Sequence, residues 1–494
     1  MTENETRRLS EDVKVFRIIA SVMLAAALLA LISCAAVGPD YTPPVPDAPA
    51  DWNTMLQDGL TTEPANAEIL AKWWTVFNDP VLSDLISQAA TGNLDLKQAE
   101  SRIREARARR GSAKAGFFPT LDTSGAYTRS RSNKTTNDLY RAGFDAGWEV
   151  DIFGGIRRSV EAADANLLAS HEDLQDVLVT LTAEVGLNYV EARTFQRRLD
   201  VANANLKAQE ETYDLIKFRY EAGLSDELDL QQARYNLEST SARIPNLRTG
   251  WAEAKNRLAV LTGKVPGGVD AILCKPYPIP VTPPTVAVGI PAEALKRRPD
   301  IRKAESELAA QTAQVGVATA DLYPRLRLSG TIGLESMLSA DFFKSASRSW
   351  NFGPGVSWNV FDAGAIRSNI EVQSALQEQS LIAYEKTILN ALEEVENALT
   401  AYAGEQLRRE RLLDAVDAAQ KAETLARDKY RAGLVNFTTV LDAQRSLLSF
   451  QEQLAISDGA VTSNLVRLYK ALGGGWESVA PSANGDGKGE DLTQ

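Results

Sequence analysis

Two very long stretches of the chain, 155–222 and 365–432, place apolar residues at helical spacing and contain no proline. In the first stretch the spacing is visible at Leu174, Val177, Leu178, Leu181, Val185 and Tyr189. At 1.5 Å per residue, each helix would be about 100 Å long. Each stretch ends at a Tyr-x-Ala-Gly-Leu turn, and a return helix is predicted after it, over about 229–261 and 439–472. Each half of the chain is therefore predicted to form a very long helical hairpin.

Ahead of each long helix, apolar and polar residues alternate with period two, which predicts a pair of strands in each half. The clearest segments are 144–152, 325–334 and 351–360, and the alternation over 121–128 is weaker. Segments of about ten residues with this period are typical of strands that face lipid on one side and water on the other. A soluble sheet packed on a core uses the same alternation, and the strands taken separately favour that alternative. Taken together with the lipobox described below, they favour the membrane.

Trp148 and Trp358 stand near the ends of these strands and would suit an aromatic girdle at a membrane interface. Loops at the cell surface are predicted near 129–143 and 335–350. Four strands cannot close a barrel around a passage, because the smallest barrels have about eight strands and filled interiors. We therefore expect the protomer to oligomerise and so complete both a barrel and a tunnel.

The two halves of the chain repeat one another. The seven residues from Asp95 match the seven from Asp300, an offset of 205, and the turn from Tyr220 matches the turn from Tyr430, an offset of 210. Further matches at these offsets extend over most of each half, so the chain is interpreted as a duplication. The predicted domains are a lipoprotein signal peptide (1–33), a lipid-anchored extended segment with equatorial contacts (34–80), the first repeat (81–263), a proline-rich linker (264–291), the second repeat (292–474) and a polar C-terminal tail (475–494).

The N-terminus has the pattern of a targeting segment. A basic region is followed by a nearly continuous apolar run over 18–32, which suits a signal-peptide core and is short for a transmembrane helix. The run ends in Leu31-Ile32-Ser33-Cys34, which resembles a bacterial lipobox. Cys34 is therefore predicted to become the lipidated N-terminus, and by resemblance to bacterial lipoproteins Ala35 favours sorting to the outer membrane. The alternative is an uncleaved anchor with an incidental cysteine.

Composition narrows the classes of function. The formal net charge of −12, without any run of Lys and Arg, argues against binding to nucleic acid. Two cysteines and one histidine are too few for a structural zinc site. His171 is interpreted as a surface or packing residue, and Cys274 in the linker as an unpaired small residue. No nucleophile–base pair, phosphate loop or metal motif is present, so we predict neither an enzyme nor a cofactor beyond covalent lipid on Cys34.

Short motifs along the mature chain resemble those of one family, the TolC-type outer membrane efflux proteins. The similarity is greatest to the lipoprotein branch that includes OprM and NodT, the outer membrane factors of RND efflux systems. The motifs are Gly38-Pro39-Asp40-Tyr41, Trp73-Trp74 with Phe77 and Asp79-Pro80, Gly289-Ile290-Pro291-Ala292-Glu293, Arg297-Arg298-Pro299-Asp300-Ile301 with Ala304-Glu305, Tyr430-Arg431-Ala432-Gly433, and Leu441-Asp442-Ala443-Gln444-Arg445-Ser446-Leu447.

The resemblance implies a fold that is mainly α with membrane β. It implies a homotrimer in which each protomer gives four strands to a twelve-stranded outer-membrane barrel and helical hairpins to a periplasmic α-barrel tunnel. The implied partners are a periplasmic adaptor protein, an inner-membrane RND-type transporter and outer-membrane lipid. The implied function is a passive exit channel for drugs or other small molecules. Two alternatives stay open, namely a protein-secretion channel of the same fold and a non-conducting lipoprotein scaffold of coiled coils.

The resemblance also implies a periplasmic gate beside the glycine turns at Gly223 and Gly433. Asp442 matches an acidic position that rings the constriction, and Arg445 matches a neighbour in the gating network. Three symmetry-related carboxylates at a narrow point would favour cations.

Three further residues complete the predicted gate. Asp229 resembles an acid on the companion hairpin that helps to tie the tips together. Thr438 and Thr439 stand where the family often has Leu or Asp, so the ring is expected to be less apolar or less charged. The alternative for both aspartates, Asp229 and Asp442, is that they are only favourable charges near helix N-termini.

Overall fold

The computed structural model describes residues 36–476 apart from 47, 57, 58, 65, 133 and 284. These residues form two units, each of which combines segments from both halves of the chain. We call them the sheet unit (36–45, 102–171 and 303–384) and the hairpin unit (46–101, 172–302 and 385–476). The predicted signal peptide, Cys34 and nearly all of the predicted C-terminal tail lie outside the described residues. The units cut across the sequence repeats, because each long helix contributes to both.

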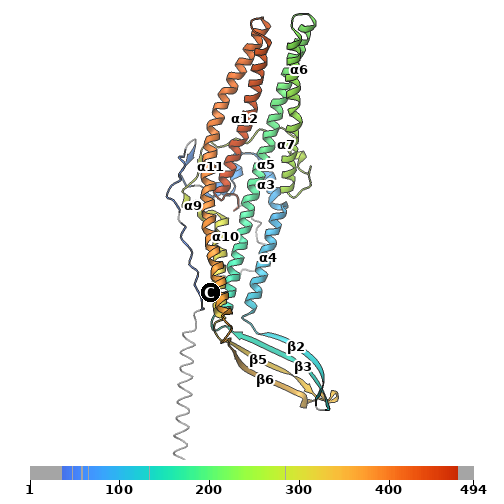
Figure 1. The fold of residues 1–494 in the computed structure, drawn as a ribbon, viewed down its shortest axis with the longest axis vertical. Helices are drawn as coiled ribbons and strands as arrows, with labels where there is room; N and C mark the ends of the chain where they lie inside the picture. Colours follow the sequence, from blue (N-terminus) through green and yellow to red (C-terminus); the bar gives the residue numbers. More distant parts are fainter. Residues whose placement is uncertain are drawn as a thin grey trace, which may run out of the picture. The chain divides into compact units, whose positions relative to one another are not determined.

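The sheet unit contains four antiparallel strands in the order β2-β3-β5-β6 (Figure 1). Their bounds are Thr120–Ser132, Thr135–Val150, Arg325–Ser336 and Arg348–Ser357. The central pair is in register with Tyr140 opposite Ser336 and Trp148 opposite Leu328. Strands β2 and β6 are therefore the edges of this sheet.

The predicted loop over 129–143 was wrong, because β2 and β3 stay paired through most of it, as far as Ser132 opposite Thr135. The apolar alternation fades there, but the backbone pairing continues with polar and aromatic cross-strand pairs. The ring of Tyr127 lies 4.9 Å from that of Tyr140, and its hydroxyl donates to Asp138 at 2.9 Å. The second connection is closer to the prediction, with two short 3₁₀ helices, η2 (Ser339–Asp341) and η3 (Ser345–Ser347).

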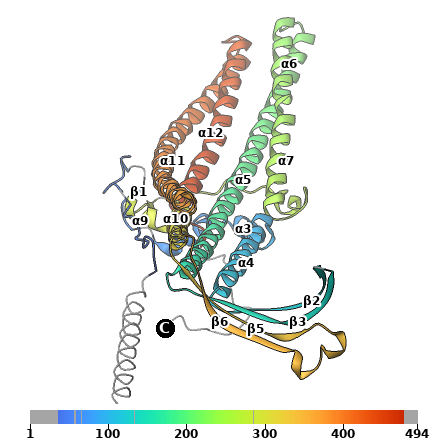
Figure 2. The same ribbon diagram turned by 60° about the horizontal axis from the view of Figure 1, so that its bottom comes forward.

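Each pair of strands is entered by one helix and left by another. α4 (Leu94–Ala115) leads into β2 and α5 (Gly155–Glu221) follows β3, while α10 (Pro299–Ala320) leads into β5 and α11 (Ala365–Arg431) follows β6 (Figure 2). Helices α5 and α11 have 67 residues each and end one residue before the predicted positions. Among the described residues, no helix combines the length and the apolar character needed to cross a bilayer.

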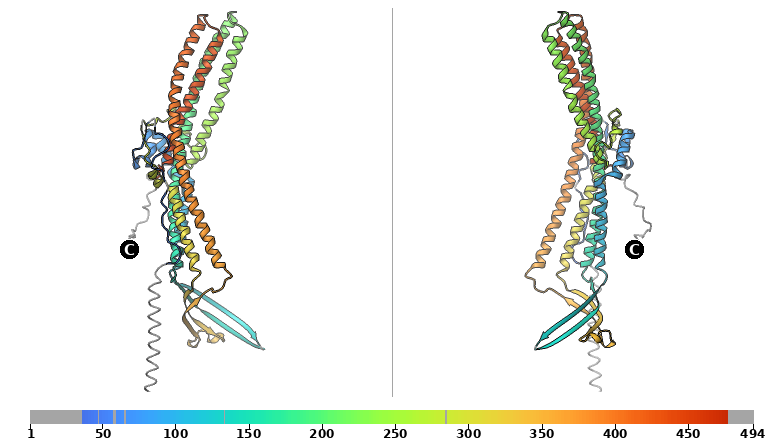
Figure 3. Two further views of the ribbon diagram at one scale, coloured as in Figure 1. Left: turned by 60° about the vertical axis from the view of Figure 1, so that its left-hand side comes forward. Right: turned by 90° about the vertical axis from the view of Figure 1, so that its right-hand side faces the viewer.

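In the hairpin unit, both long helices end at glycines with positive φ, 74° at Gly223 and 73° at Gly433. The amide of Leu224 donates to the carbonyl of Arg219 at 2.7 Å, which closes the helix end as a Schellman motif does. The chain then returns as α6 (Glu227–Ser241) and α7 (Arg243–Leu261), or as α12 (Phe437–Ala471) (Figure 3).

The single return helix predicted over 229–261 was wrong, because α6 ends at Ser241 and α7 begins at Arg243. Pro245 explains the break, since it has no N–H to give to a preceding turn and fits only in the first turn of a new helix. The second repeat has no proline at this place, and α12 is continuous over 35 residues.

The remaining short elements belong to the hairpin unit. They are β1 (Leu60–Thr61) paired in parallel with β4 (Val286–Ala287), α2 (Ala67–Ala71), η1 (Trp73–Phe77), α3 (Pro80–Gly92), α8 (Asp270–Leu273) and α9 (Pro291–Arg297). Asp79 begins α3 by accepting from the amides of Val81 and Leu82. The hydroxyl of Tyr189 on α5 donates to the same carboxylate at 2.6 Å. Burial and this hydrogen bond raise the pKa of Tyr189.

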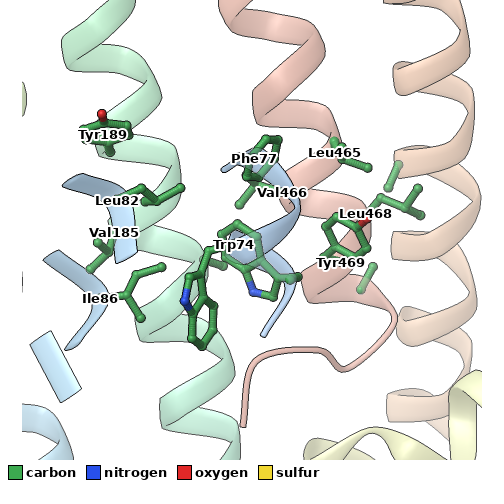
Figure 4. Packing of buried hydrophobic residues seen from close by; sticks show 14 of the residues in the cluster. Trp74, Phe77, Leu82, Ile86, Val185, Tyr189, Leu465, Val466, Leu468 and Tyr469 are labelled. Atoms are coloured by element: carbon green, nitrogen blue, oxygen red, sulfur yellow. The ribbon is translucent and has the colours of Figure 1, made fainter. Parts of the chain in front are cut away.

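The apolar core of the hairpin unit surrounds Trp73, whose side chain is fully buried. Its ring stacks on Tyr469 of α12 at 6.0 Å and meets Trp74 and Phe77 edge-on. Figure 4 shows side chains from α3, α5 and α12 converging on this region, among them Leu82, Ile86, Val185, Leu465 and Val466. The core therefore joins the N-terminal motif residues to helices of both repeats.

Candidate functional site

The predicted gate residue Arg445 lies on α12 and connects it to α6 of the other repeat. Its Nε donates to the side-chain oxygen of Asn236 at 3.2 Å. Its guanidinium lies 5.0 Å from the ring centroid of Tyr235 and donates to the Tyr235 hydroxyl. Asp442 lies one turn earlier, with its carboxylate 3.8 Å from Arg445. The structure therefore brings Asp442 and Arg445 together.

Asp229 lies in the first turn of α6 and makes local contacts there. Its amide donates to the N-cap side chain of Asp226 at 2.8 Å, and its carboxylate accepts from Ser225 at 2.9 Å. An acid in a first turn is stabilised by the helix dipole. These contacts favour the helix-end interpretation for Asp229.

Thr438 and Thr439 are both exposed in the first turn of α12. Beneath them the tip holds an apolar cluster of Ile216, Ala233, Ala426, Tyr430, Phe437, Val440 and Leu441. The rings of Tyr430 and Phe437 lie 5.5 Å apart. The cluster draws on α5, α6, α11 and α12, so it packs the tips of both hairpins against each other.

Trp148 and Trp358 make the same hydrogen bond in the two repeats. The indole N–H of Trp148 donates to the carbonyl of Phe117 at 2.9 Å, and that of Trp358 donates to the carbonyl of Leu322 at 3.0 Å. Phe117 and Leu322 follow the ends of α4 and α10. Both tryptophans therefore tie the sheet to the ends of the helices that enter it, while the two residues stay 37% and 57% exposed.

The N-terminal motif Gly38-Pro39-Asp40-Tyr41 is fixed at the same junction of sheet and helices. The amide of Val37 donates to the carbonyl of Phe153, between β3 and α5, at 3.0 Å. Asp40 accepts from the buried guanidinium of Arg158 at 2.6 Å. Gly38 has a φ of 91°, and a Cβ there would lie 2.4 Å from the Cα of Gly316. Only glycine fits so close an approach of two backbones.

A family model described as outer membrane efflux protein matches this chain twice, at residues 85–264 and 290–474. The chain belongs to the outer membrane efflux protein family. The matched segments carry the hairpins, the strands and both glycine turns.

Individual relatives extend over most of this efflux protein. Nodulation protein T of Rhizobium leguminosarum bv. trifolii is 34% identical over 456 residues, covering 91% of this chain and 96% of that protein. The solvent efflux pump outer membrane protein SrpC of Pseudomonas putida is 34% identical over 463 residues, covering 91% and 97%. The structure of the outer-membrane channel OprN aligns with a TM-score of 0.84 at 36% identity, covering 89% of this chain and 99% of that one. The predicted fold class, TolC-type helical hairpins with membrane strands, is confirmed, and so is placement in the outer membrane.

Sequence reasoning missed the partners of Arg445 in this efflux protein. Tyr235 stands 210 residues before Arg445, which is the repeat offset, so the two residues occupy equivalent places in the two hairpins and touch each other. The repeat register was the signal that could have identified Tyr235. Asn236, one residue further along α6, would have followed from it.

His171 and Cys274, the other residues with reactive side chains, have no neighbours among the described residues that suggest a catalytic role. His171 is half-buried on α5, and Cys274 is a free, exposed cysteine whose Sγ lies 3.3 Å from the carbonyl oxygen of Ala271. Within the described part of the chain, no group of three or more His, Cys, Asp or Glu residues is placed to hold a metal ion. Members of the family are channel proteins.

Proposed function

We propose that this outer membrane efflux protein is the passive exit channel of a tripartite efflux pump. Three copies would receive drugs or other small molecules from a periplasmic adaptor and an inner-membrane RND-type transporter and conduct them to the exterior. The observation that carries the proposal is a four-stranded antiparallel sheet with two edge strands, attached to duplicated helical hairpins. Relatives named for efflux of solvent, toluene and cations support small-molecule export.

Trimer formation would pair the backbone N–H and C=O groups of the two edge strands, which lipid cannot hydrogen-bond. Exposed edges of a sheet are costly in a membrane, where only helices and closed barrels satisfy the backbone. The proposed barrel would pair β6 of one copy with β2 of the next and so contain twelve strands. The duplication supports this, because the new pair would repeat the β5–β3 pairing inside the chain.

The repeat offsets predict the register of this pairing between copies. Inside the chain, Asp145 lies opposite Thr331. Adding 210 to the first residue number and subtracting 205 from the second places Gly355 of one copy opposite Ala126 of the next. In a Cys274→Ser background, Gly355→Cys with Ala126→Cys should therefore give a disulfide-linked trimer on mild oxidation, since directly opposite Cβ atoms lie about 4.5–5.5 Å apart.

A matched pair tests the register itself. Gly355→Cys with Thr128→Cys places the second thiol two residues along the same face, at about 7–8 Å, and should cross-link poorly. Efficient cross-linking of this second pair, with none of the first, would show a shifted register.

The lipid anchor is also part of the proposal. Cys34 would carry diacylglycerol on its sulfur and a fatty acyl group on its new N-terminus, because two or more chains give stable attachment whereas one is marginal. Mass spectrometry of the mature N-terminal peptide should give a mass that begins at Cys34 with these chains. An unmodified peptide, or one that begins earlier, would refute the anchor.

Conductance tests the channel function and the gate together. In planar bilayers we expect discrete cation-favouring openings, because a ring of three Asp442 carboxylates would attract cations. Arg445→Ala removes the tie between α12 and α6 and should raise the open probability about tenfold, the equivalent of 1.4 kcal/mol. Asp442→Ala should weaken the cation preference.

The control is Arg411→Ala, which removes an exposed arginine from α11 whose contact to Asp414 lies within the same helix. It should leave the current unchanged. Complete silence of the wild type and both gate variants would favour the scaffold alternative. Normal currents in both gate variants would leave Asp442 with only a helix-end role. A neighbouring gene for an RND pump, rather than for an ABC exporter with a secreted substrate, would separate small-molecule efflux from protein secretion.

A further inference from the structure

The connections of the sheet define which helices stand at the edges of the sheet unit. Helix α4 leads into the edge strand β2, and α11 follows the other edge strand β6. Helices α5 and α10 serve the central strands and pack antiparallel to each other. A Cβ on Gly316 of α10 would lie 2.8 Å from the Cγ of Arg158 of α5, and a Cβ on Gly155 would lie 3.0 Å from that of Ala320.

The duplication transfers this packing to a contact between copies. By the offsets of 205 and 210, Gly111 of α4 corresponds to Gly316, and Ser368 of α11 corresponds to Arg158. The α5–α10 contact therefore predicts that Gly111 of one copy lies opposite Ser368 of the next. In one chain a Cβ on Gly111 would meet nothing within 4 Å, so this side of α4 is open.

An apolar side chain on α11 supports the same surface. Val372 is 54% exposed, whereas its counterpart on α5, Ala162, is fully buried. Helix α10 of the same chain contacts α11 at Gln373 and Gln377. The greater exposure of Val372 is expected if a second copy of the chain covers the remaining side of α11. The occupant of this face is therefore α4 of the next copy.

The two helices carry opposite charges on the faces that would meet. Arg104 and Arg107 are exposed and lie seven and four residues before Gly111, which places them on its side of α4. Glu371 and Glu378 are exposed and lie three and ten residues after Ser368, on its side of α11. Neither glutamate has an ion-pair partner in the described part of the chain.

The α5–α10 contact within the chain lacks these charges. The counterparts of Arg104 and Arg107 on α10 are Ala309 and Thr312. On α5, the counterpart of Glu378 is Leu168, and the counterpart of Glu371 is Glu161, which is paired with Arg158 at 2.8 Å. The charges therefore differ between the contact inside the chain and the contact between copies.

We propose that Arg104 and Arg107 of one copy form ion pairs with Glu371 and Glu378 of the next copy, and so direct α4 to α11 of that copy rather than to its α5 or α10. This inference rests on the trimer of the proposed function. Along its helix axis, Arg107 lies about 6 Å from Gly111, and Glu371 lies about 4.5 Å from Ser368. If Gly111 and Ser368 lie opposite each other, Arg107 and Glu371 differ in height by only about 1.5 Å, which an arginine side chain spans.

The charges would mainly determine which helix of the next copy α4 packs against. Two nearly equivalent helix contacts in one ring allow wrong pairings, and like charges or unpaired charges make such pairings unfavourable. The attraction would be distributed over three identical boundaries, each with the same two arginines and two glutamates.

Charge reversal tests the proposal in the full-length protein in mild detergent. Arg104→Glu with Arg107→Glu should lower the ratio of trimer to monomer about tenfold or more, because attraction becomes repulsion at three boundaries. Glu371→Arg with Glu378→Arg should have the same effect. The quadruple variant should recover trimers, since it restores opposite charges. Analytical ultracentrifugation gives the ratio, and circular dichroism reports whether each variant keeps its helices.

Arg102→Glu with Arg109→Glu is the matched control, because it changes the net charge by the same amount. Arg102 and Arg109 lie nine and two residues before Gly111, which places them on the opposite side of α4. It should stay trimeric. If both reversed variants kept the wild-type ratio of trimer to monomer, the ion pairs would be refuted and the trimer would stand. Failure of the quadruple variant to recover trimers would also refute the ion pairs. A monomeric wild type would instead refute the trimer of the proposed function.

Discussion

Replacement of Trp73 by alanine is expected to lower the free energy of unfolding by about 3–5 kcal/mol, the usual cost of deleting a large buried aromatic side chain. The indole is fully buried between Tyr469 of α12 and the edges of Trp74 and Phe77. It also approaches α5 so closely that a Cβ on Gly186 would lie 2.6 Å from its ring. Deletion would leave a cavity where η1, α5 and α12 meet.

The measurement is urea unfolding of the detergent-solubilised protein followed by far-ultraviolet circular dichroism. Leu94→Ala is the control, because Leu94 is 70% exposed at the start of α4 and alanine is a good helix former. Its unfolding midpoint should stay close to that of the wild type. A loss below about 1 kcal/mol for Trp73→Ala would mean that the core around η1 does not limit stability.

The long helices were predictable because their signals are local. Absence of proline, helical spacing and a glycine that supplies positive φ placed the ends of α5 and α11 within one residue. The break between α6 and α7 was missed although Pro245 is local, because proline in a first turn and proline that ends a helix look alike in sequence. Only the interruption of the helix at Ala242 in the structure separates the two cases.

The strands were underestimated for a different reason. Apolar alternation reports which face is covered, whereas strand length depends on backbone pairing. Between Tyr127 and Tyr140 every paired side chain except Leu139 is polar or aromatic, including Arg129 with Asp138 at 3.5 Å, so the apolar alternation fades while the backbone pairing continues. A further ion pair, Arg141 with Glu335 at 3.1 Å, joins β3 to β5 in the same region.

Resemblance to the family identified only part of the candidate gate. It identified Asp442 and Arg445, which the structure places together. It could not identify Tyr235 or Asn236, because these partners lie on the other hairpin, 210 and 209 residues away, and no spacing within one helix points to them. Long-range contacts of this kind follow from the way the two repeats meet.

The motif residue Arg298 is the centre of a second long-range network. It is 8% exposed, and its guanidinium donates to Asp300 at 3.0 and 2.7 Å and to Glu394 of α11 at 2.7 Å. A further N–H donates to the carbonyl of Ala471 at the end of α12, at 2.8 Å. Burial by itself would lower the pKa of Arg298, but the two carboxylates raise it overall, so the side chain stays charged.

Arg298→Ala should therefore destabilise the hairpin unit by about 3–5 kcal/mol, because it leaves Asp300 and Glu394 without their cation and the carbonyl of Ala471 without its donor. Arg298→Lys should recover part of the loss, since lysine keeps the charge but lacks the planar fork that reaches Asp300, Glu394 and Ala471 together. The neighbouring Arg297 is the control. It contacts Glu293 of its own helix at 3.6 Å, and Arg297→Ala should cost less than about 1 kcal/mol. Equal unfolding midpoints for Arg298→Ala and Arg297→Ala would show that the fold does not depend on this network, whereas a large difference would show that the arginine joins the start of the second repeat to its last helix.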